Sequence, residues 1–288
     1  MTTRSTSPRP ERMPVSRTRE AAWVVDEMRD FGAIVRNLVP ADRYAGFARV
    51  LHRPDQGLPE PGDPTSWSAV ARLRGTTVHP QAEFNMVARL RPGAPCDFSQ
   101  PLLGTLDPIT LPLVRDVVLR HTQTGDQGWF ALWTGHGRRP ASWHQMPTFH
   151  LPGRDYWLFE GAVAAVADLS SDFENLGREE AAEAGNLTLT SLTDGPARVS
   201  AAEQVQFANR MRSAGLVQSP NLWWPEDRRW FVASDIDLDS TIVAGPLELM
   251  DDLLAEPQLE VVLVDEDTSL TNGCDQRNRT RRPDSDAE

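Results

Sequence analysis

Apolar and polar residues alternate from Arg229 to Leu238. This period of two predicts a β-strand, because successive side chains of a strand point to opposite sides. One parity is apolar apart from Ser234 and is expected to face the core. The other parity begins apolar and then becomes acidic, so we expect the strand to leave the core and run to an edge or into a cleft. Three carboxylates would then lie about 7 Å apart on one side, those of Asp235, Asp237 and Asp239.

Short apolar runs predict further strands at residues 43–52, 129–133, 155–160, 241–244 and 259–264. The run at 129–133 is apolar on both parities, which is typical of a strand covered on both faces, and the run at 259–264 is also expected to be an interior strand. Apolar spacings of three and four residues predict helices that begin near residues 20, 66, 79, 107, 201 and 246. Ser66 and Asp107 are expected to cap the second and the fourth of these helices.

This order of elements predicts an α+β fold, with a mainly antiparallel sheet and helices packed on it. A doubly wound nucleotide-binding fold would need regular strand and helix alternation and a glycine-rich first turn, and neither occurs in the sequence.

The two ends of the chain and one internal segment lack apolar periodicity. Residues 1–19 hold five arginines and predict a disordered basic arm, and residues 265–288 predict a disordered polar tail. Residues 170–200 are acidic and rich in small side chains, which predicts a flexible insertion. Residues 20–264 are expected to form one domain, or two closely packed lobes at 20–122 and 123–264.

The chain is acidic, with a formal net charge of −12 over 288 residues, and it contains nine tryptophans. This charge disfavours nonspecific binding to nucleic acid or to an anionic membrane and favours a basic partner. No apolar run reaches the eighteen residues of a membrane span, and no apolar segment follows the basic N-terminus as in a signal peptide. We therefore expect a soluble, cytoplasmic protein.

All 29 cationic residues are arginine, either through GC-rich coding or through escape from lysine modification. The lack of lysine excludes Schiff-base chemistry, lysine-based phosphate binding and a Walker-type P-loop. Cys96 and Cys274 are far apart in the sequence, so they predict neither a disulfide framework nor a metal cluster.

The three aspartates suggest a site for a divalent cation such as Mg²⁺, Mn²⁺ or Ca²⁺, because hard cations prefer carboxylate oxygens. The alternative is a solvated strand end whose like charges discourage edge pairing. A calcium-binding EF-hand loop is excluded, because Ser240 stands where that loop needs glycine and Pro246 where it needs glutamate.

The loop that follows residue 133 holds the second candidate site. His136, His144 and His150, with Asp155 as a fourth ligand, are the residue types that bind zinc, although their spacing matches no compact zinc motif. In the metal hypothesis His136 or His144 serves as a base beside the aspartates. An anion site is the other interpretation of this loop, built from two glycines and two arginines: Gly135, Gly137, Arg138 and Arg139.

Trp223 and Trp224 precede Pro225 in a predicted loop. Adjacent residues of an extended segment face opposite ways, so at least one of the two is expected to line a partner-binding groove.

Several strings carry a resemblance, namely LWWPEDRRWFVASDIDLDSTIVAG, GDQGWFALWTGHG, ARVLHRP and DYWLFEG. They resemble a set of uncharacterised proteins from GC-rich Gram-positive bacteria, over residues 43–264 without the insertion. This resemblance implies no catalytic residues. The order of elements is also similar to that of the SMI1/KNR4 (SUKH-like) group, an α+β fold with toxin-immunity and interaction members. That second similarity concerns the fold alone.

Two functions follow from these features. The first is a non-enzymatic binding protein, with an immunity-like inhibitor as one form, that engages a basic partner through an acidic, tryptophan-bearing surface at Trp223, Trp224, Asp235, Asp237 and Asp239. The second is a metal-dependent, hydrolase-like enzyme that uses the aspartates as ligands. No organic cofactor is expected, and the sequence does not fix an oligomeric state.

Overall fold

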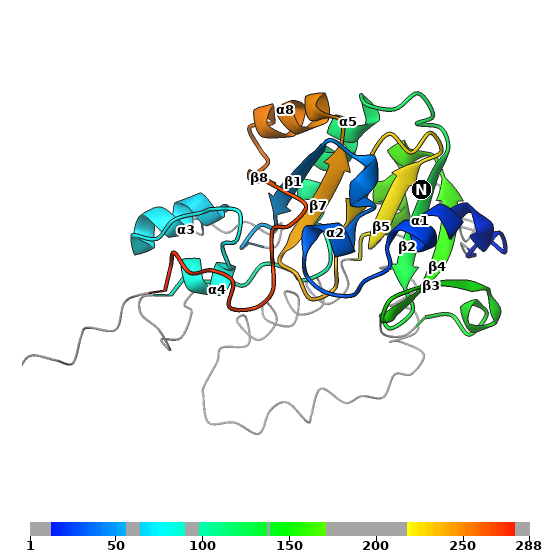
Figure 1. Ribbon diagram of the computed structural model, residues 1–288, viewed down its shortest axis with the longest axis horizontal. Helices are drawn as coiled ribbons and strands as arrows, with labels where there is room; N and C mark the ends of the chain where they lie inside the picture. Colours follow the sequence, from blue (N-terminus) through cyan, green and yellow to red (C-terminus); the bar gives the residue numbers. More distant parts are fainter. Residues whose placement is uncertain (1–12, 56–63, 90–97, 137–138, 171–217, 280–288) are drawn as a thin grey trace, which may run out of the picture.

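The computed structural model describes residues 13–55, 64–89, 98–136, 139–170 and 218–279. In this part of the chain, eight strands form one antiparallel sheet in the order β3-β4-β2-β5-β6-β7-β1-β8 (Figure 1). The strands are β1 (Gly46–Leu51), β2 (Gly128–Trp133), β3 (Thr148–Leu151), β4 (Arg154–Gly161), β5 (Leu222–Pro225), β6 (Phe231–Ala233), β7 (Ser240–Gly245) and β8 (Val261–Val264). Helices pack on this sheet, so the predicted α+β class is confirmed.

Both faces of the central strands are buried, and neighbouring residues therefore enter different cores. In β2, Trp129 joins one buried cluster and Phe130 joins the cluster on the opposite face. The same alternation separates Phe231 from Val232 in β6. The predicted burial of residues 129–133 on both faces is confirmed.

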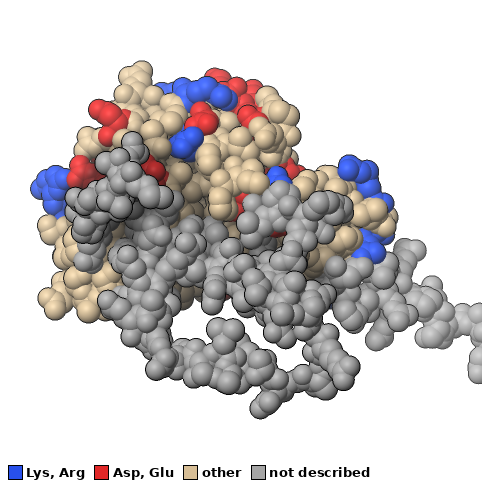
Figure 2. All heavy atoms as spheres, turned by 180° about the vertical axis from the view of Figure 1, so that it is seen from behind, with Lys and Arg blue, Asp and Glu red and all other residues tan. Residues whose placement is uncertain are grey.

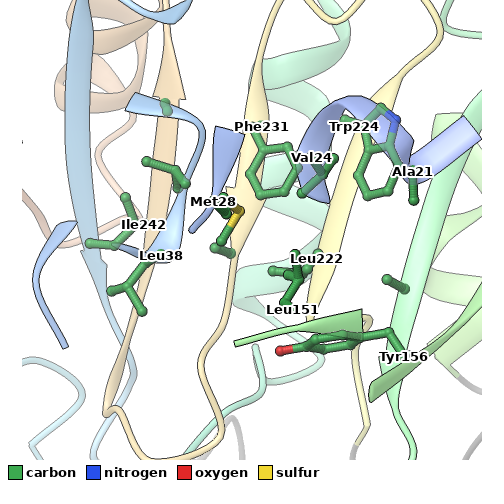
Figure 3. Close-up of a cluster of buried hydrophobic side chains, with 14 of the residues drawn as sticks. Ala21, Val24, Met28, Leu38, Leu151, Tyr156, Leu222, Trp224, Phe231 and Ile242 are labelled. Atoms are coloured by element: carbon green, nitrogen blue, oxygen red, sulfur yellow. The ribbon is translucent and has the colours of Figure 1, made fainter. Parts of the chain in front are cut away.

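Short N-terminal helices cover the first face, where α1 (Ala22–Glu27) and α2 (Val35–Leu38) lie in front of the sheet in Figure 1. Figure 3 shows side chains of this cluster from α1 and from the strands, including Val24, Trp224 and Phe231. The opposite face is covered by α5 (Thr110–Leu119) and α8 (Leu247–Ala255). A third cluster lies under α3 (Trp67–Arg74) and α4 (Phe84–Val87). Single-turn 3₁₀ helices occur at Thr18–Ala21, Ala41–Arg43, Trp143–Gln145 and Val163–Ala165.

Two helix starts follow the predicted capping chemistry. The Ser66 hydroxyl accepts a hydrogen bond from the Ala69 N–H at 3.2 Å, as expected of an N-cap. The Asp107 carboxylate accepts from the Ile109 and Thr110 N–H groups at 2.9 and 3.0 Å before α5. Local side-chain chemistry was therefore enough to place these two starts.

Two predicted helices are shorter in the structure. The helix predicted to continue from residue 20 to Val35 ends at Glu27, and Met28 leaves the helical conformation with φ −95° and ψ 89°. The helix predicted from His79 is reduced to the four residues of α4. In the first segment Trp23, Val24 and Val35 still reach the core from α1 and α2, whereas Phe31 between the two helices is 64% exposed.

The final strand was predicted as interior, and this prediction is wrong. β8 lies at the end of the sheet order and pairs with β1 alone. Its residues are half-buried or exposed, whereas every residue of β1 is buried. The apolar run at residues 261–264 is therefore an uncovered edge.

Residues 265–279 do not form the predicted disordered tail. The Leu270 N–H donates to the Ala33 carbonyl at 2.7 Å, and the buried Asp275 carboxylate lies 2.9 Å from His79 Nε2. At the other end, the Val15 N–H donates to the Leu158 carbonyl at 2.7 Å, so the predicted arm is ordered from residue 13. The predicted insertion at 170–200 and the helix at 201–211 lie outside the described residues, apart from Ser170.

The two predicted lobes share the sheet. β1 comes from residues 20–122, yet it lies between β7 and β8, which come from residues 123–264. A single sheet therefore contains strands from both segments.

Candidate functional site

The acidic stretch after β6 is a turn. β6 ends at Ala233, and residues 234–239 lead into β7 through a turn in which Asp235 Oδ1 accepts a hydrogen bond from the Asp237 N–H at 3.0 Å. A carboxylate that binds the backbone two residues further on favours a turn over extended chain. The strand predicted from Arg229 to Leu238 is therefore wrong beyond Ala233, and the aspartates do not continue along one face of a strand.

Arg154 holds two of the three carboxylates. Its guanidinium donates to Asp235 Oδ1 at 3.0 Å and to Asp237 Oδ2 at 2.9 Å. The guanidinium carbon also lies 5.5 Å from the centroid of the Phe31 ring and 5.7 Å from that of Trp133. Burial lowers the pKa of Arg154, but the hydrogen bond with Asp237 and the charge of Asp235 outweigh burial, so the pKa lies above its ordinary value. Both carboxylates are therefore engaged by a charged arginine.

Asp239 belongs to a different site. Its Oδ1 accepts from Arg49 at 3.1 Å, and its Oδ2 accepts from the Phe84 N–H at 3.3 Å. Arg49 is buried, and it also donates to the Ser240 hydroxyl and to backbone carbonyls before α4. Asp239 therefore connects β1 and β7 to α4 rather than joining the other two aspartates.

The candidate histidines lie at separate places. His136 Nε2 lies 3.0 Å from Asn221 Oδ1, and burial lowers the pKa of this histidine to about 4. His144 packs its ring against Trp157, and His150 lies 2.8 Å from Asp155 Oδ1. Within the described residues, no three histidine, cysteine or acidic side chains are grouped closely enough to hold a metal ion.

The predicted anion loop is only partly described. Gly137 and Arg138 lie outside the described residues, and Arg139 is half-buried. Gly135 lies against a ring, because a Cβ built on it would be 2.1 Å from an atom of Trp133. The glycine therefore permits this ring packing, and the anion site stays a prediction.

Trp223 and Trp224 lie in β5, not in a loop, and both are buried. Trp223 contacts Phe130 and Trp230 on one face of the sheet, whereas Trp224 stacks on Phe231 on the other, as Figure 3 shows. The two residues do face opposite ways, but each face is covered. The prediction that one of them lines a partner-binding groove is wrong.

A buried polar network at one end of the central strands was missed from the sequence. The Ser234 hydroxyl lies 2.6 Å from the Thr241 hydroxyl, which lies 2.8 Å from His52 Nε2. Asn221 joins the same region by donating to the Ser234 carbonyl at 3.0 Å. These side chains are buried, and none of them lines either cavity described below. We assign the network a structural role, because buried polar groups must be paired.

The cavities in the described part of the chain include the following two. The larger, of 430 Å³, lies before β8, and its polar lining includes Arg53, Ser68 and Glu260. Glu260 accepts from the Ser68 N–H at 2.7 Å, and Arg53 donates to Asp55 at 2.6 Å. The smaller, of 160 Å³, includes Arg154 with its two aspartates. Apart from Asp30 in the smaller cavity, the charged side chains that line these two cavities form internal contacts, and neither lining includes a histidine or a cysteine.

The edge of β8 offers unpaired backbone groups. The Leu51 N–H donates to the Glu260 carbonyl at 2.9 Å, and Arg49 is paired with Val262. Because the ladder of an antiparallel pair alternates, Val261 and Leu263 direct their N–H and C=O groups away from β1. Among the described residues, no backbone hydrogen bond reaches these outward groups.

Exposed leucines accompany this edge. Leu263 is 46% exposed, and the outward flank of α8 carries Leu247 and Leu254 at 59% and 46% exposure. Asp252 on the other flank contacts His121, just after α5. Leu247 lies over the start of β1, because a Cβ built on Gly46 would be 3.2 Å from its Cδ2. We call Leu247, Leu254 and Leu263 the leucine shelf.

Acidic side chains flank the leucine shelf. α8 contains no basic residue. Further carboxylates follow β8 directly, and two of them, Glu266 and Asp267, contact Arg36 of α2 on the first face of the sheet. We call these residues the acidic surface: Glu248, Asp251, Asp252, Glu256, Asp265, Glu266 and Asp267. Figure 2 shows acidic side chains, interspersed with arginines, at the top of the molecule, where Figure 1 places α5 and α8.

The fold and this surface define an α+β protein whose open antiparallel sheet has one apolar, acid-flanked edge. No family model, curated protein or solved structure matches the chain. Over the described residues, no helix combines the length and the apolar character that crossing a bilayer requires.

Proposed function

We propose that the protein is a non-enzymatic binding protein that holds a basic partner protein against the acidic surface. One observation carries this proposal. The acidic surface lies beside the leucine shelf, on α8 and on the residues that follow β8, which is the exposed edge strand of the sheet. An apolar strip within a charged rim is the usual composition of a protein interface.

The charge balance of the acidic surface supports a cationic partner. Asp252 contacts Arg120 and His121, and Arg36 contacts Glu266 and Asp267. Glu248 and Asp251 form no ion pair with a described residue. Exposed pairs contribute little affinity each, but an uncompensated field accelerates association with an oppositely charged protein.

The alternative from the sequence, a metal-dependent hydrolase, gains no support from the described residues, because its carboxylates contact arginines at two separate places. An immunity-like inhibitor of a basic enzyme or toxin is one form of the proposed function. The cytoplasm is the compartment that we propose for it.

A pull-down from the source cell tests the proposal. The double variant Glu248→Gln/Asp251→Asn is compared with Asp26→Asn/Asp30→Asn, which removes the same charge from exposed carboxylates at and just after α1, on the other face of the sheet. The retained partner is expected to be basic, to elute as salt rises, and to be lost from the first variant only. Equal retention by both variants would contradict the proposal.

A further inference from the structure

The two edges of the sheet differ in how they are protected against pairing. β3 lies between Pro147 and Pro152, and its His150 contacts the Asp155 carboxylate of β4. Proline and charge are the usual means by which edges are kept from pairing with other chains. β8 has the sequence VVLV, with no proline and no charge inside the strand. A strand edge without proline or charge can pair with other chains and cause aggregation. We therefore interpret the exposed edge of β8 as a binding surface.

We infer that the edge of β8 receives an extended, basic segment of the partner protein as a ninth strand of the sheet. This inference rests on the proposed function and adds the mode of binding to it. The outward N–H and C=O groups of Val261 and Leu263 supply the hydrogen bonds of the new pairing.

The side chains of the added strand meet different surroundings on the two sides of the sheet. Leu263 and its partner Ala48 point to the side of α8, because Ala48 lies in the cluster that α8 covers. α8 begins beside Gly46 at the start of β1, and Val261 of β8 packs against the cluster that α8 covers. One parity of the added strand therefore lies on the leucine shelf.

Charge selects a basic segment. Side chains that project beyond the leucine shelf approach the carboxylates of α8, and those past the end of β8 approach Asp265. The opposite side is bordered by α3, which carries Arg72 and Arg74. A segment whose central residues are apolar on the side of the leucine shelf and uncharged on the side of α3, with cations at its two ends, is the complement of this arrangement. A second copy of this chain is disfavoured as the occupant, because it would bring two acidic surfaces together.

The probe is a blocked, fluorescent peptide of eight residues, in which valine and threonine alternate over the six central positions and arginine stands at each end. Its control carries N-methyl groups on two adjacent central residues, which removes one donor from each edge and keeps the charge. The unmodified peptide is expected to bind in low salt and to slow amide exchange at Val261 and Leu263. The methylated peptide is expected to bind about tenfold more weakly or less.

Two protein variants complement the peptide. Leu263→Pro removes an outward N–H that makes no bond to β1, and Leu263→Lys places a cation on the edge without changing the backbone. Both are expected to lose the peptide. Val25→Lys is the control, because Val25 is an exposed apolar residue of α1, on the other face of the sheet. Thermal unfolding identifies any variant that fails to fold.

The outcomes separate the two proposals. In one outcome the peptide binds, Glu248→Gln/Asp251→Asn weakens its binding, the methylated peptide binds equally well, and amide exchange at Val261 and Leu263 is not slowed. This outcome overturns strand addition and leaves the acidic binding function standing. If the peptide does not bind in low salt, strand addition is overturned, and the pull-down decides the function. A dimer in sedimentation that Leu263→Lys dissociates would show that a second copy occupies the edge, and would also overturn the inference.

Discussion

Removal of Asp239 should destabilise the protein far more than removal of Asp237, although the two carboxylates are only two residues apart. The Arg49 side chain is 3% exposed, and Asp239 is its carboxylate partner. The Asp237 side chain is 74% exposed, and Arg154 keeps Asp235 when Asp237 is removed. The comparison therefore tests whether these aspartates serve separate structural roles.

The expected magnitudes follow from burial. Burial lowers the pKa of Arg49, which shows that desolvation of its guanidinium is the main cost of this site. A buried charge that loses its partner costs about 3–5 kcal/mol, so we expect Asp239→Ala to lose that amount. An exposed ion pair contributes about 0–1 kcal/mol, so Asp237→Ala should stay within that range.

Urea unfolding followed by tryptophan fluorescence measures both losses, with an unchanged denaturant slope as the check on two-state behaviour. The double variant Arg49→Met/Asp239→Ala is the control, because it removes both charges and should recover part of the stability lost by Asp239→Ala. Equal losses for Asp237→Ala and Asp239→Ala would refute the reasoning.

Two further predictions concern residues that the sequence placed in functional sites. Trp224→Ala should cost about 3–5 kcal/mol of unfolding free energy, because a large buried side chain is removed from contact with Trp23 and Phe231; a loss below about 1 kcal/mol in urea would contradict the assigned core role. Burial lowers the pKa of His136 to about 4 from an ordinary value of 6.5, so the unfolded chain binds a proton more readily between these values. Stability should therefore fall as pH drops from 6.5 toward 4, by up to about 1.4 kcal/mol per unit for this residue. His52, whose pKa burial also lowers, adds to the same trend. His136→Gln should flatten the pH dependence measured by thermal unfolding, and an unchanged slope would count against the buried, neutral state.

Local signals predicted the elements whose chemistry is contained within a few residues. The Ser66 cap, the Asp107 cap and the doubly covered strand at residues 129–133 all follow from neighbouring side chains. The end of β6 could not be found in this way. Alternation continues past Ala233 in the sequence, but Arg154, some eighty residues earlier, binds Asp235 and Asp237 and fixes the turn.

The candidate surface was missed for a related reason. An apolar run such as residues 261–264 has the same composition in the middle of a sheet and at its edge, and only the strand order distinguishes the two. Trp223 and Trp224 gave the opposite error, because the predicted loop around them is a central strand with both faces covered.

The sequence by itself determined the α+β class, the caps, most strands and the acidic character of the protein, because periodicity, capping and charge are properties of neighbouring residues or of the whole composition. Only the tertiary structure decided which apolar strand is left uncovered and which arginine meets which aspartate. Those outcomes depend on contacts between residues far apart in the chain, and the free energy of such a contact depends on burial that no local pattern specifies.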